Sequence, residues 1–287
     1  MNAFHACSSA PFYATAEKGA RFRLEAFELL CMALSALTWR ANGGSIRLFA
    51  DAPAASYLRR QGLGPLWDGG IDDSMDDALE GLNPRTFWAA GKLLALDKAT
   101  APCVMLDMDF IVWRDLTSQL MGDSLVVAHR EELYPSVYPP PDSFWMQEGY
   151  TFPADYDPQA LPCNTAFAYF GDEELRREYV REALRFMHAA RGTDSLTYMV
   201  FAEQRLLAML CAARGLPIGT LLPMDGVFAP QRDVTHLWGH KRRLREDVCA
   251  REDFIRRCLL RIHKDFADLF PLIAAAEEIT PYAKRLL

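Results

Sequence analysis

The sequence lacks the features that mark secreted, membrane-spanning or nucleic-acid-binding proteins. Its 287 residues carry a net charge of −7, and a surface that follows a phosphate backbone needs clustered positive charge instead. No apolar run approaches the roughly 20 residues that span a bilayer, and no positively charged segment precedes the first apolar residues. We therefore expect no nucleic-acid partner, no transmembrane segment and no secretory signal.

A disulfide framework is also missing. The seven cysteines are odd in number and form no CxxC pair, which fits reduced thiols better than paired ones. Cys31, Cys103 and Cys211 lie in apolar runs, so we expect them in the core as small hydrophobic residues. This cysteine usage predicts a cytoplasmic protein.

Helix-like and strand-like segments alternate along the chain. Apolar residues at helical spacing indicate helices, and short apolar runs between turn residues indicate strands. Such alternation predicts βαβ units, hence an α/β fold with a mainly parallel, Rossmann-like sheet flanked by helices. We expect strands at 45–50, 102–113, 123–130, 164–171 and 216–223, helices at 22–40, 55–63, 84–99, 172–191 and 195–214, and a helical end from about residue 251.

The segment between residues 132 and 162 is rich in proline and aromatic residues and has no clear period. A loop of this length is usually functional or mobile. Its aromatic residues, from Tyr134 to Phe152, favour two interpretations equally. They form a platform on which an acceptor stacks, or they belong to a lid that packs on the sheet. We expect a further polar loop at residues 235–243.

Two carboxylates, Asp107 and Asp109, interrupt the apolar stretch "PCVMLDMDFIVW". An extended chain places alternate side chains on one face, and open α/β sheets bind ligands at the ends of their strands. Two nearby carboxylates suit a hard cation such as Mg²⁺ or Mn²⁺. The alternative is a turn in which each aspartate caps backbone N–H groups. We favour the metal site.

Three further basic residues are candidates for the same site. A neutral imidazole from His236 suits Mn²⁺, although His240 is an equally available donor and either histidine could lie on the surface. Gly239 would let the backbone approach a phosphate, and Lys241 would bring a charge to it. Lys92 either meets a diphosphate or extends its ammonium group to solvent.

Several motifs, in order, resemble those of GT-A fold glycosyltransferases, in particular the glycogenin and lipopolysaccharide galactosyltransferase group and bacterial relatives of unassigned function. They are "FWAAGKLLAL", then the Asp-x-Asp strand, then "NTAFAYFG", "AEQRLL" and "HLWGHK". The resemblance runs from about Ser45 to Lys241. It departs from the group's pattern at Thr165-Ala166, where the group has Ala-Gly.

The resemblance implies a metal-dependent hexosyltransferase that moves a sugar from a nucleotide-diphosphate sugar to an acceptor hydroxyl with retention of configuration. The acceptor would be an unknown glycan, lipid-linked molecule or protein. The implied metal ligands are Asp107, Asp109 and His236, holding Mn²⁺ or Mg²⁺. The implied donor-binding residues are Asp51 at the base or ribose and Lys92, Lys241 and Gly239 at the phosphates. Asn164 and Gln204 would line the sugar and join Asp109 in catalysis.

An inverting reaction would instead need a carboxylate base, for which Glu203, Asp225 and Asp172 are the candidates. A rival hypothesis is a degenerate module that binds nucleotide sugar without turnover. A less favoured one is a phosphatase of the haloacid dehalogenase type, in which the first aspartate is the nucleophile. We expect one GT-A-like domain over 1–287, with a nucleotide-sugar half at 1–130, an acceptor and catalytic half at 131–250 and terminal helices at 251–287.

Overall fold

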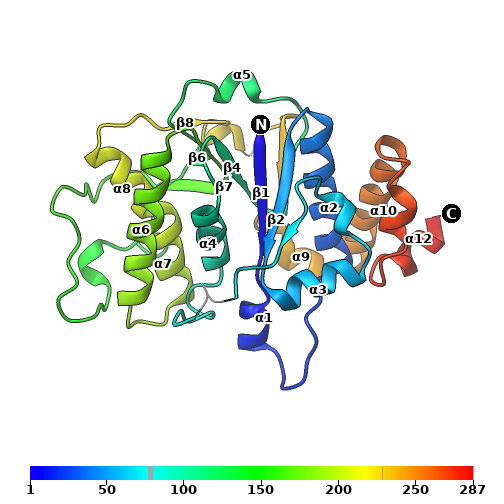
Figure 1. Ribbon diagram of the computed structural model, residues 1–287, viewed down its shortest axis with the longest axis horizontal. Coiled ribbons are helices and arrows are strands. Elements are labelled where there is room, and N and C mark those ends of the chain that lie inside the picture. The colour runs from blue at the N-terminus through cyan, green and yellow to red at the C-terminus, as the bar shows by residue number, and fades with distance from the viewer. Residues whose placement is uncertain (77–79, 228, 287) are drawn as a thin grey trace.

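The computed structural model describes residues 1–76, 80–227 and 229–286. In that part of the chain a seven-stranded sheet has the strand order β3-β2-β1-β4-β7-β6-β8, and β5 pairs with β9 in a separate two-stranded sheet. Figure 1 shows the large sheet between two groups of helices. The strands are β1 (Asn2–Cys7), β2 (Ser45–Ala50), β3 (Ile71–Asp72), β4 (Cys103–Leu106), β5 (Phe110–Val112), β6 (Leu125–Arg130), β7 (Cys163–Phe170), β8 (Gly219–Thr220) and β9 (Val234–His236).

The pairing of these strands is mainly parallel, as predicted. Strand β1 pairs in parallel with β2 and β4, and β2 pairs in parallel with β3. Strand β7 is antiparallel to both of its neighbours, β4 and β6, whereas β6 and β8 are parallel. The α/β sheet flanked by helices is therefore confirmed, with β7 as its reversed strand.

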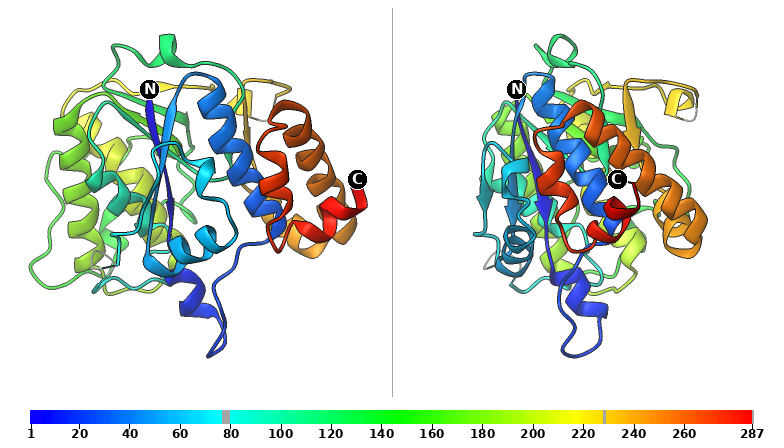
Figure 2. Two further views of the ribbon diagram at one scale, coloured as in Figure 1. Left: turned by 45° about the vertical axis from the view of Figure 1, so that its right-hand side comes forward. Right: turned by 90° about the vertical axis from the view of Figure 1, so that its right-hand side faces the viewer.

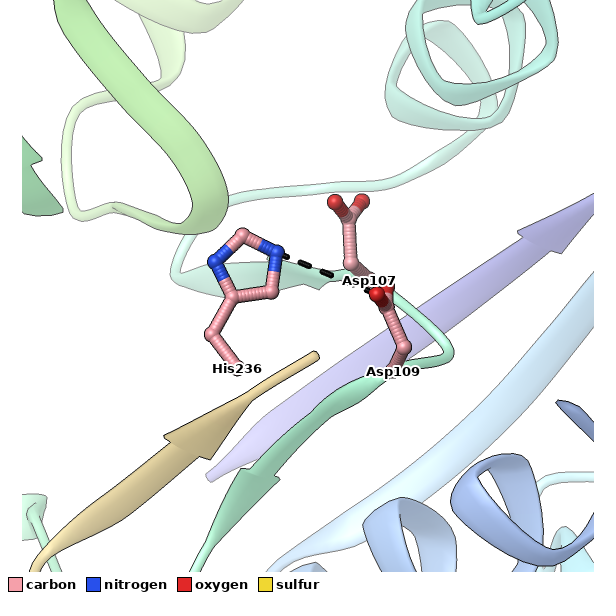
Figure 3. A group of neighbouring side chains, drawn as sticks. All are labelled: Asp107, Asp109 and His236. Atoms are coloured by element: carbon pink, nitrogen blue, oxygen red, sulfur yellow. Dashed lines mark ion pairs between the residues drawn. The ribbon is translucent and has the colours of Figure 1, made fainter. Parts of the chain in front are cut away.

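Two parts of the strand prediction are wrong. Strand β1, at the centre of the parallel half, was not predicted, because its sequence NAFHAC is short and has no β-branched residue. The run at 102–113 is two strands, because a turn at Asp107 and Asp109 separates β4 from β5 (Figure 3). Both aspartates nevertheless follow the carboxyl end of β4, as expected.

The predicted helices are present, with shifted ends. The prediction placed the start of α4 at residue 84, but residues 84–89 form turns and the helix begins at Ala90. The predicted polar loop at 235–243 is instead the end of β9 and the start of α9. The helices are α1 (Ala10–Thr15), α2 (Ala26–Ala41), α3 (Ala52–Arg60), α4 (Ala90–Lys98), α5 (Thr117–Leu120), α6 (Glu173–Ala189), α7 (Ser195–Val200), α8 (Leu206–Ala213), α9 (His240–Glu246), α10 (Val248–Asp265), α11 (Phe270–Ala274) and α12 (Thr280–Leu286).

Four shorter helical segments complete the described part of the chain. A π-helical segment, η4 (Phe201–Arg205), joins α7 to α8 without a break. The 3₁₀ turns are η1 (Gly64–Leu66), η3 (Pro141–Ser143) and η5 (Asp225–Val227). π-Helical turns inside α-helices occur frequently at functional sites. We therefore expect η4 to contribute residues to the candidate site.

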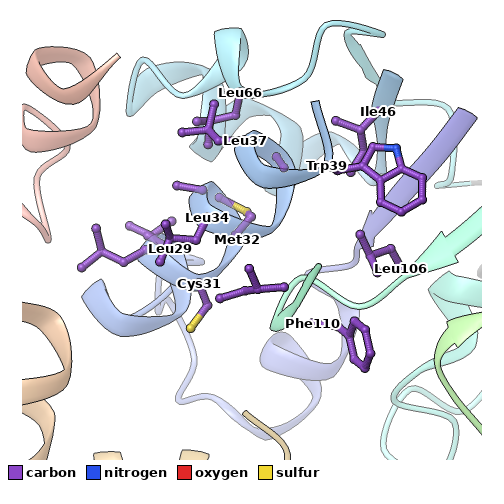
Figure 4. Close-up of a cluster of buried hydrophobic side chains, with 14 of the residues drawn as sticks. Leu29, Cys31, Met32, Leu34, Leu37, Trp39, Ile46, Leu66, Leu106 and Phe110 are labelled. Carbon is purple, nitrogen blue, oxygen red and sulfur yellow. The ribbon is translucent and has the colours of Figure 1, made fainter. Parts of the chain in front are cut away.

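The sheet is buried on both faces, which explains the apolar run at β4. Val104 and Leu106 belong to a cluster with residues of α2, α3 and α10, part of which Figure 4 shows. Cys103 and Met105 point to the other face and pack with residues of α4, α6 and α8. Strands buried on both faces have continuous rather than alternating hydrophobic sequences. The cysteines predicted in the core, Cys31, Cys103 and Cys211, are all buried.

One helical stretch among the described residues, Ser195–Ala213, is long and apolar enough to span a bilayer by length and composition. Within its most apolar window, 72% is buried inside the protein. It therefore has the packing of a core helix, and the test alone is weak evidence for a span.

Candidate functional site

Asp107 and Asp109 lie in the tight turn between β4 and β5. The N–H of Asp107 donates to the carbonyl of Ala166 on β7 at 2.8 Å, which continues the β4–β7 ladder. The N–H of Phe110 donates to the carbonyl of Asp107 at 3.0 Å and closes a four-residue turn. The turn therefore presents both carboxylates at the carboxyl end of β4.

The two-stranded sheet brings His236 to this turn. Phe110 is opposite His236 in the β5–β9 ladder, and the N–H of Leu237 donates to the carbonyl of Asp109 at 3.2 Å. Donor atoms of Asp107, Asp109 and His236 all lie within 4.8 Å of one another, and Nε2 of His236 is 4.0 Å from Oδ2 of Asp109 (Figure 3). His240 is exposed at the start of α9, so His236 is the histidine in this group.

Two lysines neutralise the carboxylates. Nζ of Lys92, in the first turn of α4, lies 2.7 Å from Oδ1 of Asp107 and also contacts Glu203. Nζ of Lys241 lies 2.9 Å from Oδ2 of Asp109. Burial lowers the pKa of both lysines, but the carboxylates more than offset it and raise each pKa above its ordinary value. Both ammonium groups are therefore charged, and Lys92 does not extend to solvent.

The same electrostatics set the protonation of the candidate metal ligands. Burial raises the pKa of Asp107, but Lys92 and His236 outweigh it and leave that pKa below its ordinary value. Burial lowers the pKa of His236, against the opposing effect of Asp109 and Asp107. At neutral pH the site therefore offers a carboxylate and a neutral imidazole, the forms that coordinate metals.

A cavity of about 500 Å³ surrounds this group. Its volume lies within the range of small-molecule sites in proteins. The carboxyl end of β1, the segment before α2, helix α7 and η4 all contribute residues to its lining. The lining residues that matter for the site are Cys7, Ser8, Phe22, Leu24, Lys92, Asp107, Asp109, Asn164, Glu203, Gln204, His236 and Lys241.

Asn164, Glu203 and Gln204 form the wall of the cavity near β7 and η4. Nδ2 of Asn164 donates to Oε1 of Glu131 at 2.9 Å, and the hydroxyl of Tyr138 donates to Oε1 of Gln204 at 2.6 Å. Glu203 is almost fully buried. The structure thus brings both predicted sugar-binding residues, Asn164 and Gln204, into the cavity.

Thr165, where the sequence departs from the glycosyltransferase motif, links Glu203 to Lys92 in this wall. Its hydroxyl donates to Oε1 of Glu203 at 2.7 Å, and its carbonyl accepts a hydrogen bond from Lys92 at 3.1 Å. The threonine thereby fixes the carboxylate that neutralises Lys92. An alanine at this position would lack that hydroxyl.

The other predicted site residues lie elsewhere. Asp51 caps α3 by accepting from the N–H of Ala54 at 3.0 Å, and it also accepts from Ser9 N and Ser8 Oγ. Gly239 is exposed before α9 and has an ordinary φ of −68°. Neither lines the cavity.

Of the three carboxylates considered as a base, only Glu203 lines the cavity. Asp172 caps α6, where it accepts a hydrogen bond from the N–H of Leu175 at 3.0 Å. Asp225 is exposed in η5.

The aromatic loop is packed rather than open. Phe144 is buried against Phe186 and Phe201, and Tyr150 and Phe152 also contact Phe186. This supports the interpretation of a packed element over that of an open aromatic platform, with α6 and η4 rather than the sheet as its main contacts. Tyr134 and Trp145 are the exceptions, being 53% and 69% exposed.

Sequence reasoning missed several cavity residues. Cys7 and Ser8 were missed with β1 itself, and Trp88, Leu196 and Trp238 were not singled out because their exposure depends on the folded chain. The signal for Trp238 was present, since it lies inside the "HLWGHK" motif.

The fold resembles several solved glycosyltransferases at low sequence identity. An active-site mutant of LgtC has a TM-score of 0.44 at 14% identity, covering 83% of this chain and 88% of that one. The PaToxG glycosyltransferase has a TM-score of 0.40 at 10% identity, covering 99% of this chain and 86% of that one. Mouse xyloside xylosyltransferase 1 has a TM-score of 0.36 at 12% identity, covering 77% and 84%. These TM-scores are low, and the fold is defined by the strand order described above.

Sequence comparison gives the family but no activity. No curated protein matches the chain. A model of one protein family matches residues 13–237, which include β2, β4 and β7 and end just after His236. The chain therefore belongs to the family of unknown function DUF6734.

Proposed function

We propose that the protein is a metal-dependent glycosyltransferase that moves a sugar from a nucleotide-diphosphate sugar to an acceptor hydroxyl. One observation carries the proposal. Two aspartates and a histidine from segments far apart in sequence converge within 4.8 Å, beside two charged lysines, in a cavity of about 500 Å³. A cation site next to fixed ammonium groups suits a diphosphate.

The donor set fits Mn²⁺ or Mg²⁺. Carboxylate oxygens suit both ions, and the neutral imidazole of His236 favours Mn²⁺. Asp107, Asp109 and Glu203 share two lysines, so the cluster keeps one unit of negative charge that a divalent ion would reverse. When bound, the ion would act as a Lewis acid that stabilises a departing diphosphate.

The chain's own residues would bind and orient the donor. Lys92 and Lys241 would exchange part of their contact with the aspartates for phosphate oxygens. Asn164 and Gln204 would bind the transferred sugar, with Gln204 beside its reacting carbon in a retaining reaction. If the reaction inverts, Glu203 is the carboxylate base, although it must first be released from Lys92 and Thr165.

The cellular location of the protein and the identity of its acceptor are also proposals. The odd number of cysteines and the lack of CxxC pairs support action in the reducing cytoplasm. The acceptor is a glycan, a lipid-linked molecule or a protein that carries a free hydroxyl.

The proposal is tested by calorimetry of UDP, GDP, ADP and CDP binding with and without Mn²⁺, followed by hydrolysis of the matching nucleotide sugar. We expect Mn²⁺-dependent binding of one nucleotide that Asp109→Asn abolishes in a folded protein. Asp97→Asn, an exposed aspartate on α4, is the matched control and should bind normally.

The outcomes separate the alternatives. Unchanged Mn²⁺-dependent affinity in folded Asp109→Asn would remove the metal site. Nucleotide-sugar binding without any hydrolysis or transfer would favour the degenerate binding module. Absence of nucleotide binding under all conditions would remove the glycosyltransferase assignment.

A further inference from the structure

Three large apolar side chains stand exposed at the cavity. Trp88, Leu196 and Trp238 are 48%, 47% and 46% exposed, and all three line the cavity that contains the aspartates. An isolated exposed apolar residue needs no explanation, but a group of them around one cavity marks a binding surface.

The indole of Trp88 is held in place. Its Nε1 donates to the carbonyl of Ser195 at 3.1 Å, so the ring lies beside Leu196 at the start of α7. An immobilised aromatic ring loses little entropy when a ligand stacks on it. Trp88 and Leu196 therefore form a rigid apolar edge.

Trp238 lies beside His236, one of the candidate metal ligands. Its ring is nearly parallel to that of His236, with an interplanar angle of 14° and centroids 6.3 Å apart. Its φ of +20° is unique among the described non-glycine residues. Such a backbone is costly for a bulky residue and occurs mainly at functional sites.

Part of the cavity wall is uncharged. Asn164, Val200 and Gln204 line it, and Oε1 of Gln204 accepts from Tyr138, which leaves its amide group for a ligand. Among the charged lining residues, Lys92 pairs with Asp107 and Glu203, and Lys241 pairs with Asp109. An occupant of this wall is therefore neutral, with apolar faces and hydroxyl edges.

We propose that Trp88, Leu196 and Trp238 form the acceptor platform, and that the acceptor group bound there is a neutral pyranose ring. A pyranose has C–H faces that pack on indole rings and hydroxyl edges that bond to amides, so it matches both parts of the lining. Among the described residues, the lysines that line the cavity, Lys92 and Lys241, pair with carboxylates and would serve the donor phosphates, so a phosphorylated or acidic acceptor would find no further lysine there. The assignment of this sugar as acceptor rests on the proposed function, whereas the binding of a neutral sugar does not.

The test is saturation-transfer NMR with the full-length protein, Mn²⁺ and the best-binding nucleotide. The probes are methyl α- and β-glycosides of glucose, galactose, mannose and xylose, with glucose 6-phosphate as the acidic probe and octyl alcohol as the lipid probe. We expect at least one neutral glycoside to bind. Trp88→Ala and Trp238→Ala should each weaken it by about tenfold, as expected for loss of an aromatic stacking contact.

Two variants control for structural effects. Trp88→Phe keeps a ring and should retain most of the binding, although it loses the hydrogen bond to Ser195. Trp145→Ala removes an even more exposed tryptophan that does not line the cavity, and it should have no effect on glycoside binding.

Nucleotide-sugar hydrolysis, measured on the same samples, separates this inference from the proposed function. Hydrolysis by Trp145→Ala should equal that of the parent, because Trp145 does not line the cavity. The platform is refuted if no neutral glycoside binds, if only the phosphate or octyl probe binds, or if both alanine variants bind like the parent. Sugar binding without donor hydrolysis would support the platform and contradict the transferase.

Discussion

At the scale of single residues, the candidate metal site carries its own cations. Lys241 contacts Asp109 at 2.9 Å and Lys92 contacts Asp107 at 2.7 Å. Under the proposed function, each lysine would compete with a metal ion for a carboxylate and would also be available to a phosphate. The lysines would therefore couple the two binding events, since a phosphate that draws a lysine away would leave its aspartate free for the metal.

Lys241→Met should separate these two effects. Without the ammonium group, Mn²⁺ alone should bind about fivefold more tightly, the effect of a partly exposed ion pair of about 1 kcal/mol. The nucleotide, measured at saturating Mn²⁺, should bind more weakly because a phosphate contact is lost. Calorimetry of both titrations tests this, with Lys98→Met on the exposed end of α4 as the control. Weaker Mn²⁺ binding in Lys241→Met would contradict the competition.

His5 is a buried histidine whose hydrogen bonds lead to Phe110, the residue that follows the turn of Asp107 and Asp109. Because the indole N–H of Trp67 can only donate, Nδ1 of His5 accepts it at 3.2 Å. The Nε2 proton then points to Oγ of Ser35 at 3.0 Å, and Ser35 donates to the carbonyl of Phe110 at 2.6 Å. Burial, opposed by the charge of Asp107, lowers the pKa of His5 to about 3.

This depressed pKa predicts acid sensitivity. As the pH falls below 6.5, the unfolded chain protonates at His5 while the folded chain stays neutral, so stability falls between pH 6.5 and about 3. At pH 5 the loss is about 2 kcal/mol. Urea unfolding at pH 7 and pH 5 should show a smaller pH effect in His5→Asn than in the parent or in His188→Asn, which changes an exposed histidine. Equal pH effects in all three proteins would assign the acid sensitivity to other groups.

At the scale of elements, the long loop after β6 is tied to the helical segment that carries Gln204. Arg205 in η4 is 1% exposed and donates to the carbonyls of Pro158 and Ala160 at 2.7 and 2.9 Å. No carboxylate pairs with it among the described residues, and burial lowers its pKa. A buried charge without an ion pair is costly. These two hydrogen bonds offset part of the cost of burying the guanidinium group.

Arg205→Met should free the loop. The methionine fills similar space but leaves two carbonyls without their donor, which costs about 1–3 kcal/mol each where they are buried. We expect the parent to resist limited proteolysis between residues 144 and 160, and the variant to be cut there. Arg177→Met, at an exposed position on α6, should behave like the parent. Equal cleavage of parent and Arg205→Met would show that the aromatic contacts alone hold the loop.

The same elements show what the sequence predicts and what it does not. Local patterns identified β4, β7, α6 and the carboxylates at the end of β4, because burial on two faces and strand termination leave a local signal. The β5–β9 pair could not be predicted, since three-residue strands distant in sequence have no local signature. Asp51 shows that a correct local pattern can still mislead. An aspartate at a strand end can cap a helix as well as bind a ligand.

The residues that line the cavity show the same limit of local sequence patterns. Lys92 could be identified from its motif, but its two carboxylate partners come from β4 and η4, which only the folded chain brings together. The aromatic loop had the composition of a platform, yet Phe144 and Phe152 pack against helix residues. Trp88 and Trp238 gave no sign of their exposure, since exposure is a property of the whole fold.

At the scale of the whole molecule, the C-terminal helices belong to the core on one side of the sheet. Ile255, Leu259 and Ile262 of α10 are at most 1% exposed and lie in one hydrophobic cluster with residues of α2 and β4. Figure 2 shows α10–α12 alongside α2 in both views. The cavity lies at the carboxyl ends of β1 and β4, in the sheet whose face this cluster covers. We therefore expect residues 1–287 to unfold as one unit.

Neighbouring leucines on α10 test this expectation without truncating the chain. Leu259 is 1% exposed and Leu260 is 44% exposed, so Leu259→Ala should cost about 2–5 kcal/mol and Leu260→Ala about 0.5 kcal/mol or less. If the molecule is one cooperative unit, Leu259→Ala will lower the melting temperature of a single calorimetric transition. Mn²⁺-dependent nucleotide affinity at 20 °C should stay the same, since the candidate metal ligands lie on β9 and on the turn after β4. A transition that splits in two, with Mn²⁺ stabilising only the upper one, would instead show that the terminal helices fold separately from the cavity.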